Sequence, residues 1–420
     1  MARVLTLDDV NLDGRTVIVR IDINSPLDPV TNVFLDDIRM RRIIPTLNRL
    51  SKSKVVLITH QSRPGKKDFT STLGHARELG RILGRPVKFV DDIHGEKALS
   101  AIEMMEDGDL IMLNNIRMDE QEVNLKGDFN VQAEALLVQH LAGIADAFVN
   151  DAFACSHRSS ASIVGFTHLI PCIAGELMNH ELAKLGKALE DPIRPSIAVL
   201  GGIKIDDSVT VADNMLRKGI CDHIWVTGGV ANLFLHLSGI DLGQLNIDFL
   251  KNELGDTWND TTNAASALLK NFPERIIMPS DIAANVEGNR VDLSLGQLPI
   301  EAPIFDLGLT SIRALSKAIK TAGTIILNGP AGVFELPDFA LGTIEMINAC
   351  AETSGYVVVG GGHTATIINQ RGLSDRMGHV STGGGASLEL LAGRELPGVS
   401  SLEASAEQFE MSIQKPLDHL

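Results

Sequence analysis

The sequence is poor in aromatic residues and in cysteine, and it has no long hydrophobic run. Aromatic residues make up 4% of its 420 residues. Four cysteines, Cys155, Cys172, Cys221 and Cys350, lie far apart without a CxxC pair, which predicts reduced, packed thiols and neither a zinc site nor a disulfide framework. No apolar stretch approaches the roughly 18 residues that cross a bilayer, and the first residues lack the apolar core of a signal peptide. We therefore expect a cytoplasmic protein with no membrane partner.

Positive charge is also scarce. The chain has 37 basic and 53 acidic residues, a formal net charge of −16. A nucleic-acid partner would require a broad basic surface, so none is predicted, and an anionic ligand would have to meet a local cluster of positive side chains. Hydrophobic residues at 44% and charged residues at 21% are typical of a packed globular protein, and the length indicates two domains.

Short apolar runs without alternation recur along the chain, separated by longer segments with helical periodicity. The runs lie at 16–21, 54–59, 109–113, 146–149, 196–200, 222–227, 323–327 and 355–359. Such runs are typical of parallel strands that are buried on both faces. The alternation of strand and helix predicts an α/β fold with two doubly wound, Rossmann-like parallel-sheet domains.

A helical segment with a proline-rich exit separates two series of these units. We expect an N-terminal domain over 1–173, a connecting helix and hinge over 174–195, and a C-terminal domain over 196–395. Residues 396–420 are too few for a third domain. They are predicted to pack back on the first.

Polar residues are concentrated directly after the strands of the first domain. Ligands of open α/β sheets bind beyond the carboxyl ends of the strands. Those positions hold Asp22, Asn24, His60, Arg63, Arg117 and Arg158. Arginine offers planar, bidentate donors to carboxylate and phosphate, so this edge predicts an anion site, in which the aspartate and asparagine would accept hydrogen bonds from ligand hydroxyls.

Glycine follows the strands of the second domain instead. The glycine-rich turns lie at 201–202, 228–229, 329–332, 360–362 and 383–385. Such turns let the backbone approach phosphate, and the last two open onto helical runs whose first N–H groups would be free. Neither a GxxxxGK[ST] motif nor a dinucleotide-type GxGxxG motif is present. The pattern predicts a second, phosphate-bearing ligand, facing the first across a cleft.

These motifs, in this order, resemble those of the phosphoglycerate kinase family along nearly the whole chain. The segments that carry the resemblance are RIDINSP from Arg20, HQSRP from His60, VNDAF from Val149 with His157-Arg158, GGIK from Gly201, LNGPAGVFE from Leu327 and STGGGAS from Ser381. The resemblance implies reversible phosphoryl transfer between 1,3-bisphosphoglycerate and ADP, which gives 3-phosphoglycerate and ATP with Mg²⁺. It implies small-molecule partners and a monomer or homodimer.

Position by position, the resemblance assigns roles in both domains. The glycerate substrate would be held by Asp22, Asn24, Arg39, His60, Arg63, Arg117 and Arg158. The nucleotide would be bound by Gly201, Gly202, Lys204, Gly228, Gly229, Leu309, Asn328, Pro330, Glu335, Gly361, Gly362, His363 and Thr364. Catalysis would depend on Arg39, Lys204 and the N–H groups of Gly362 and Gly385. No metal ligand is assigned.

Several positions depart from the common motifs of the family. Ser208 stands where a second lysine is common and His363 where an aspartate is common, and both changes are typical of the archaeal-like branch. The other departures are Asn114 and Met118 on either side of the motif arginine, and Ser160 in place of a second histidine. Ser160 leaves open whether an outer substrate contact is made.

The implied chemistry needs no strong general base, because the attacking carboxylate or phosphate oxygens are already anionic at neutral pH. Catalysis would rest on in-line positioning and charge neutralisation as the domains close. For the metal, Asp206 or Asp207 would be an outer-shell oxygen donor while His363 contacts a phosphate, or both aspartates would only cap a helix that begins near Ser208.

Two alternatives stay open at this point. One is a kinase on the same scaffold that acts on a different small phosphorylated acid. The other is a protein that binds phosphorylated metabolites and has lost turnover through the changes at Ser208 and His363.

Overall fold

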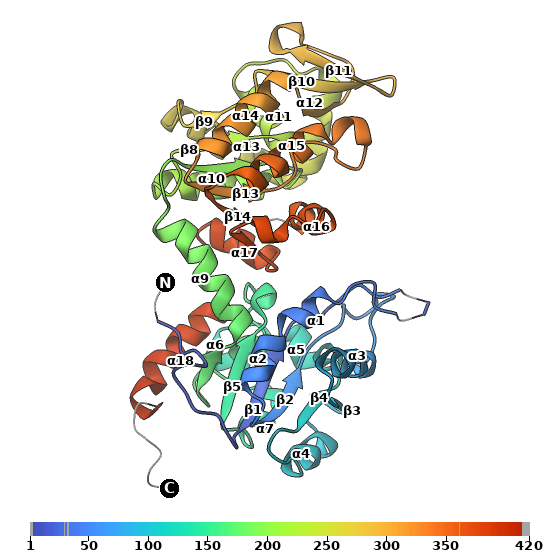
Figure 1. Ribbon diagram of the computed structural model, residues 1–420, viewed down its shortest axis with the longest axis vertical. Helices are drawn as coiled ribbons and strands as arrows, with labels where there is room; N and C mark the ends of the chain where they lie inside the picture. Colours follow the sequence, from blue (N-terminus) through green and yellow to red (C-terminus); the bar gives the residue numbers. More distant parts are fainter. Residues whose placement is uncertain (1–2, 29, 32, 361, 414–420) are drawn as a thin grey trace. The chain divides into compact units, whose positions relative to one another are not determined.

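The computed structural model describes residues 3–28, 30–31, 33–360 and 362–413. The chain divides into two compact units (Figure 1): Met1–Leu182 with Glu395–Leu420, and Ala183–Arg394. Each unit contains a six-stranded parallel sheet with helices packed on it. The assignment of a substrate to each domain stays a prediction.

The sheet of the first unit has the strand order β3-β4-β2-β1-β5-β6. Its strands are β1 (Thr16–Ile21), β2 (Lys54–Ile58), β3 (Lys88–Val90), β4 (Leu110–Leu113), β5 (Ala147–Asp151) and β6 (Cys172–Ala174). All residues of β4 and β5 are buried, as required for central strands covered on both faces. The helices are α1 (Ile38–Arg42), α2 (Ile44–Arg49), α3 (Leu73–Leu83), α4 (Glu96–Glu103), α5 (Glu120–Asn124), α6 (Phe129–Ala133), α7 (Leu136–Ala142) and α8 (Ala161–Val164).

The sheet of the second unit has the order β15-β14-β13-β7-β8-β9. Its strands are β7 (Ser196–Leu200), β8 (His223–Val226), β9 (Ile276–Ile277), β13 (Thr324–Asn328), β14 (Tyr356–Val359) and β15 (His379–Val380). The helices are α10 (Ile205–Arg217), α11 (Gly228–Leu237), α12 (Gln244–Leu254), α13 (Trp258–Asn271), α14 (Leu309–Thr321), α15 (Leu341–Glu352), α16 (Gly362–Gln370) and α17 (Gly385–Leu391). The predicted α/β fold class and the eight predicted strands are confirmed, with ends that differ by up to two residues.

A small antiparallel sheet in the second unit is missing from the prediction. It has the order β11-β10-β12 and contains β10 (Asp281–Val286), β11 (Asn289–Ser294) and β12 (Ile304–Leu307). Its strands are partly exposed and carry charged residues, whereas the prediction followed continuous apolar runs. The sheet matters because β12 forms part of the wall of the cavity described below.

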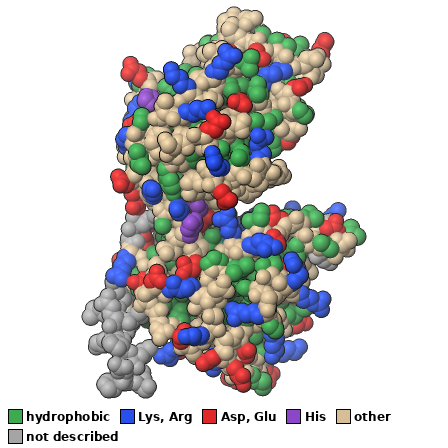
Figure 2. Space-filling model, in the orientation of Figure 1, with side chains coloured by type: hydrophobic (Ala, Val, Ile, Leu, Met, Phe, Trp, Pro, Cys, Tyr) green, Lys and Arg blue, Asp and Glu red, His purple; other side chains and the backbone are tan. Residues whose placement is uncertain are grey.

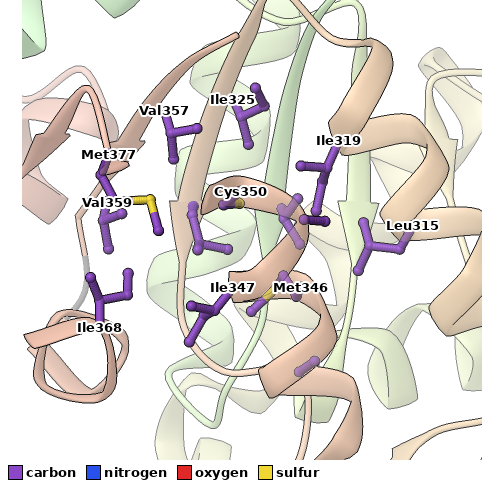
Figure 3. Packing of buried hydrophobic residues seen from close by; sticks show 14 of the residues in the cluster. Leu315, Ile319, Ile325, Met346, Ile347, Cys350, Val357, Val359, Ile368 and Met377 are labelled. Carbon is purple, nitrogen blue, oxygen red and sulfur yellow. The ribbon is translucent and has the colours of Figure 1, made fainter. Parts of the chain in front are cut away.

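The core of the second unit lies between its parallel sheet and helices α14 and α15. Figure 3 shows side chains from these helices packed against side chains from the strands; the cluster includes Leu315, Ile319, Met346, Ile347, Cys350, Ile325, Val357 and Val359. Complete burial of one such aliphatic side chain contributes about 1.5–3 kcal/mol. The strand ends that carry the glycine turns are therefore held in place by a tightly packed core.

Two long helices lie at or next to the points in the sequence where the chain passes from one unit to the other. The 15-residue helix α9 (Glu176–Glu190) begins where Asp151 accepts hydrogen bonds from the backbone N–H groups of Leu177 and Met178, at 2.9 and 3.1 Å. Helix α18 (Pro397–Ile413) packs against α8 and β6, and the Ser405 hydroxyl accepts a hydrogen bond from the N–H of Cys172 at 2.9 Å.

The four cysteines are free and buried, as predicted. Burial raises the pKa of Cys155 to about 11 and those of Cys172, Cys221 and Cys350 to about 12, so they remain protonated, unreactive thiols. Among the helices that the structure describes, we find none with the length and apolar character needed to cross a membrane.

Candidate active site

The parallel order of β4, β2, β1 and β5 brings the polar residues after these strands to one edge of the sheet. Arg63 follows β2, Arg117 lies in the short 3₁₀ helix η1 (Ile116–Met118) after β4, and Arg158 follows β5. All three line one cavity of about 550 Å³. The structure therefore brings together three arginines that are distant in the sequence.

Asp22 and Arg39 form an ion pair at the end of β1. Asp22 is 7% exposed, and burial alone would raise its pKa, but Arg39, followed by His60 and Arg20, holds that pKa below its usual value. The carboxylate also accepts a hydrogen bond from the N–H of Asn24 at 3.1 Å. Asp22 is therefore a charged acceptor that positions the Arg39 guanidinium.

His60 is a neutral hydrogen-bond donor. Burial and the charge of Arg20 lower its pKa well below the usual value. The Arg20 guanidinium lies 3.1 Å from His60 Nδ1, and because a guanidinium can only donate, Nδ1 is the acceptor. The ring proton must then be on Nε2, which leaves an N–H donor for a ligand oxygen.

The arginines of the cavity have few negative neighbours. Burial, and then the charges of Arg158 and Arg20, lower the pKa of Arg117 to about 10, so it stays charged at neutral pH. Its guanidinium donates to the carbonyl of Ser62, and Arg158 Nε donates to His157 Nε2 at 3.1 Å. On the face drawn in Figure 2, acidic and basic side chains are interspersed over both units, so this cluster is a local feature of an acidic protein.

Two charged residues of this cavity were not predicted. Glu122 is 8% exposed, and it accepts hydrogen bonds from the hydroxyls of Ser160 and Ser162 at 3.0 and 2.7 Å and from the N–H of Ser162 at 2.9 Å. Lys126 lines the same cavity and adds a fourth cation. The Ser160 proton is thus directed at Glu122, and Lys126 is the side chain available for the outer contact. Neither residue directly follows a strand, so the search for polar residues at strand ends could not identify them.

A cluster that resembles a metal site lies just after the ends of β1, β2 and β5. Ligand atoms of Asp22, His60 and Cys155 lie within 4.8 Å of one another, and all three residues are buried. The Arg20 guanidinium, however, lies 3.1 Å from His60 Nδ1 and 3.9 Å from Cys155 Sγ, and Arg39 pairs with Asp22. Guanidinium groups already occupy the positions that a cation would need, so we assign no metal here.

The second unit contains a separate cavity of about 480 Å³ beside its glycine turns. Six predicted nucleotide residues line it: Gly202, Gly228, Gly229, Pro330, Glu335 and His363. Gly201, Lys204, Leu309, Asn328, Gly362 and Thr364 do not line it, and Gly361 lies outside the described residues. The roles of these residues stay predictions.

Glycine is required in these turns because three of them interlock. A Cβ on Gly201 would lie 2.4 Å from the carbonyl oxygen of Pro330, and Gly228, with φ of +55°, would place one 2.9 Å from the nitrogen of Gly202. The N–H groups of Gly201, Gly202 and Gly229 donate to backbone carbonyls at 2.8, 2.9 and 3.1 Å. These glycines allow close packing. Helix α16 begins at Gly362, and the first N–H groups of a helix have no partner within it, so α16 is the better candidate for phosphate contacts.

Much of the rest of the cavity wall is apolar and was not predicted. It includes Leu245 and Phe249 of α12, Ile304 and Phe305 of β12, and Phe334. Leu245 and Phe249 remain 44% and 43% exposed, which is unusual for large apolar side chains in a packed unit. In the sequence, an apolar residue on a cavity wall has the same pattern as one in the core.

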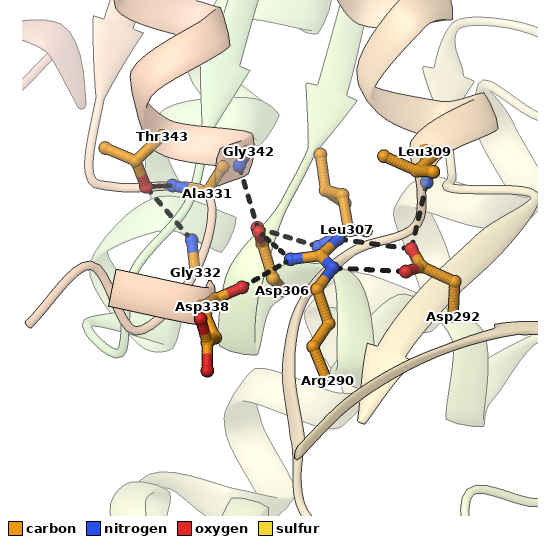
Figure 4. A network of polar contacts seen from close by, with 10 residues as sticks. All are labelled: Arg290, Asp292, Asp306, Leu307, Leu309, Ala331, Gly332, Asp338, Gly342 and Thr343. Atoms are coloured by element: carbon orange, nitrogen blue, oxygen red, sulfur yellow. Dashed lines mark hydrogen bonds and ion pairs between the residues drawn. The ribbon is translucent and has the colours of Figure 1, made fainter. Parts of the chain in front are cut away.

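A polar network fixes the turn between β13 and α15 (Figure 4). Arg290 donates to Asp306 at 2.8 Å, and Asp306 also accepts from the N–H of Gly342 at 2.9 Å. The Thr343 hydroxyl accepts from the N–H groups of Ala331 and Gly332, at 3.0 and 3.3 Å. The network therefore holds the NGPAG turn in place beside the cavity.

We expect Asp306→Asn to lower the free energy of unfolding by about 2 kcal/mol, since it removes the more deeply buried of the two carboxylates that accept hydrogen bonds from the Arg290 guanidinium, the other being Asp292 at 3.1 Å. The side chains of Asp306 and Arg290 are 0% and 14% exposed. The control is Glu352→Gln in the exposed pair with Lys320, where about 1 kcal/mol or less is expected. Urea unfolding of both variants tests this; equal, small losses would show that the Arg290 pair contributes little.

Lys204 and two aspartates begin helix α10. The helix starts at Ile205 with Lys204 as its N-cap residue and without a side-chain capping bond. The predicted helix start near Ser208 is therefore wrong, because the helix begins three residues earlier and both aspartates lie in its first turn. The roles of the two aspartates stay predictions. Asp206 accepts from the N–H of Asp207 at 2.9 Å. Burial, and then the charge of Asp206, raise the pKa of Asp207.

Two α/β units, one with an arginine-lined anion cavity and the other with a glycine-bounded cavity near a helix N-terminus, are typical of a phosphotransferase that uses two phosphorylated ligands. Comparison with known proteins gives the family. The family model for phosphoglycerate kinase matches residues 7–394. The chain belongs to the phosphoglycerate kinase family, which confirms the resemblance.

Individual relatives agree with this assignment. A phosphoglycerate kinase of Methanothermobacter thermautotrophicus is 46% identical over 402 residues, covering 95% of this chain and 97% of that protein. The crystal structure of phosphoglycerate kinase from Pyrococcus horikoshii has a TM-score of 0.86 at 36% identity and covers 96% of this chain and 100% of that one. The enzyme from Coxiella burnetii has a TM-score of 0.79 at 31% identity, covering 95% and 99%. The predicted family, archaeal-like branch and kinase activity are confirmed.

Proposed function

We propose that this chain transfers a phosphoryl group reversibly between 1,3-bisphosphoglycerate and ADP, with the glycerate in the arginine cavity and the nucleotide in the glycine-bounded cavity. One observation carries the proposal. Four cations, Arg63, Arg117, Lys126 and Arg158, line the first cavity, and the single carboxylate among its described lining residues, Glu122, is already hydrogen-bonded to serines. Such a cavity suits a ligand that carries both phosphate and carboxylate.

In this proposal, each polar group of the first unit has a defined task. The His60 Nε2–H donates to a substrate oxygen, and Asp22 and Asn24 accept from the substrate hydroxyl. The arginines hold the distal phosphate, while Arg39 reaches the group in transfer. No proton has to be removed from the attacking oxygen, so positioning and charge neutralisation account for the rate enhancement. Transfer would follow closure of the domains, with 174–195 as the hinge.

We also propose that Mg²⁺ accompanies the nucleotide. The residues present fit an oxygen-preferring ion: Asp207 is half-buried, and no hydrogen bond to its carboxylate occurs among the residues that the structure describes. Bound Mg²⁺ would neutralise phosphate charge. Asp207 would hold it through water, and His363, which lines the cavity, would contact a phosphate.

Changing Asp207 to asparagine should raise the Mg²⁺ concentration needed for half-maximal activity by about 5-fold or more at fixed nucleotide, because a charged oxygen acceptor is lost. His363→Ala should weaken nucleotide binding and leave the Mg²⁺ requirement unchanged. Titration of Mg²⁺ at constant ATP measures both. The reverse assignment of effects would make His363 the residue on the metal side.

The function is tested by a coupled assay with Mg-ATP and a panel of acids. 3-Phosphoglycerate should be phosphorylated. D-Glycerate should be at least 1,000-fold poorer in kcat/KM, because the cavity arginines would then lack their anion. Preference for another phosphorylated acid would support the alternative kinase, and ATP binding without turnover of any acid would support the binding protein.

We also propose that this chain is located in the cytoplasm. The four buried free thiols support that location.

A further inference from the structure

Two asparagines line the cavity of the second unit, and they differ in their hydrogen bonds. The Asn246 amide is fully used: its nitrogen donates to the carbonyls of Leu242 and Ala302, at 2.8 and 3.1 Å, and its oxygen accepts from the N–H of Ile304 at 2.9 Å. Asn246 therefore ties α12 to β12. It has little left to offer a ligand.

Asn232 makes no such bonds. It is 6% exposed, lines the same cavity, and forms no hydrogen bond with any described residue. Its amide atoms are also not among the described side-chain atoms that are both sealed from solvent and unpaired, so the amide retains access to the cavity. Buried polar side chains are normally paired, so an amide left unpaired beside an open cavity points to a partner in the ligand.

The position of Asn232 indicates which part of a nucleotide it would meet. It lies four residues, about one helical turn, after Gly228 at the start of α11. Helix α11 packs against α12 and β12, which supply the apolar walls Phe249 and Ile304. Apolar walls suit a heterocyclic base, whose remaining binding requirement is hydrogen bonding at its polar edge.

We propose that the Asn232 amide recognises the substituent at C6 of a purine base. This inference rests on the proposed function, which places a nucleotide in this cavity. An amide carries a donor and an acceptor side by side. The oxygen would accept from the 6-amino group of adenine. Because no described residue fixes the amide, it can rotate and donate its N–H to the 6-oxo group of guanine. The site should therefore bind purines that carry either a hydrogen-bond donor or a hydrogen-bond acceptor at C6.

The test is calorimetric binding of ADP, GDP and the diphosphate of purine riboside, which lacks a C6 substituent, to the full-length chain. Asn232→Leu, which keeps the branched shape, should weaken ADP and GDP about 10-fold and change purine riboside diphosphate by less than about 2-fold. Asn232→Asp, which has no donor, should keep ADP within about 3-fold and weaken GDP by about 100-fold, since two acceptors would face each other. If leucine overpacks the site, Asn232→Ala replaces it as the variant, and the same changes in affinity for the three ligands are expected.

A structural explanation is excluded by thermal unfolding. Asn232→Leu should not lower Tm, because the amide has no protein partner, whereas Asn246→Ala should lower Tm and leave the ratio of ADP to GDP affinity unchanged. If all Asn232 variants bind the three ligands with unchanged relative affinities, the C6 contact does not exist, although the proposed function stands. If the wild-type chain binds none of them, the proposed function fails as well.

Discussion

Replacing Arg39 by lysine should lower kcat about 100-fold or more and change the KM for 3-phosphoglycerate much less. The planar fork of a guanidinium can span two oxygens of a phosphoryl group in transfer, and a single ammonium cannot. Arg39 is prepared for this role, because Asp22 holds its guanidinium while the side chain remains 37% exposed. Steady-state kinetics at saturating Mg-ATP measure the effect.

Arg41→Lys is the matched control. Arg41 lies in the same short helix, α1, but pairs with Asp37 at 2.7 Å on an exposed surface, so kcat should stay within about 2-fold. An unchanged kcat in Arg39→Lys would remove Arg39 from the transfer step. A rise in KM alone would leave it as a binding residue.

The parts of the fold that were predictable are those in which local pattern and burial coincide. β4 and β5 are buried at every residue, and β4 and the first three residues of β5 are apolar, so both are recognisable as buried strands in the sequence. The strands β9 and β15 have two residues each, which is too short to form a recognisable run, and they exist because a neighbouring strand offers hydrogen-bonding groups. The β10–β12 sheet is partly exposed and charged, so its pairing depends on tertiary contacts that a local window does not contain.

The site residues also divide into those that could be predicted from the sequence and those that could not. Arg63, Arg117 and Arg158 could be predicted because chain topology alone brings the ends of parallel strands together. The tautomer of His60 could not, since it depends on a 3.1 Å contact with Arg20 across the sheet. Asn232 has no sequence signal either, because what sets it apart from Asn246 is the absence of a partner among the described residues.

The glycine turns show a further difference between motif and geometry. From the sequence, all five turns let the backbone approach phosphate, and the turns at 360–362 and 383–385 are also predicted to open onto helices. In the structure, the N–H groups of Gly201, Gly202 and Gly229 are used by backbone carbonyls, whereas α16 begins at Gly362, and the first N–H groups of a helix have no partner within it. Phosphate contacts in this unit should therefore come from the first turns of α16 and α17, which begin at Gly362 and Gly385, and from the Lys204 side chain before α10.

Lys204→Met should lower kcat by about 1,000-fold, the largest effect that we expect from a single substitution. Lys204 is exposed at the N-cap of α10, and among the described residues it has no hydrogen bond or ion pair, so its loss should not change Tm. Methionine keeps most of the apolar stem and removes the charge that would stabilise the phosphoryl group in transfer.

Lys218→Met is the control, because Lys218 is the C-cap residue of the same helix and lies far from the glycine turns along its axis. It should retain kcat within about 2-fold. Lys204→Arg should recover part of the activity, since it restores the charge in a different shape. If Lys204→Met raises only the KM for ATP, Lys204 binds the nucleotide in the ground state and the transition state equally, and the rate enhancement must then come from Arg39 and the first turn of α16.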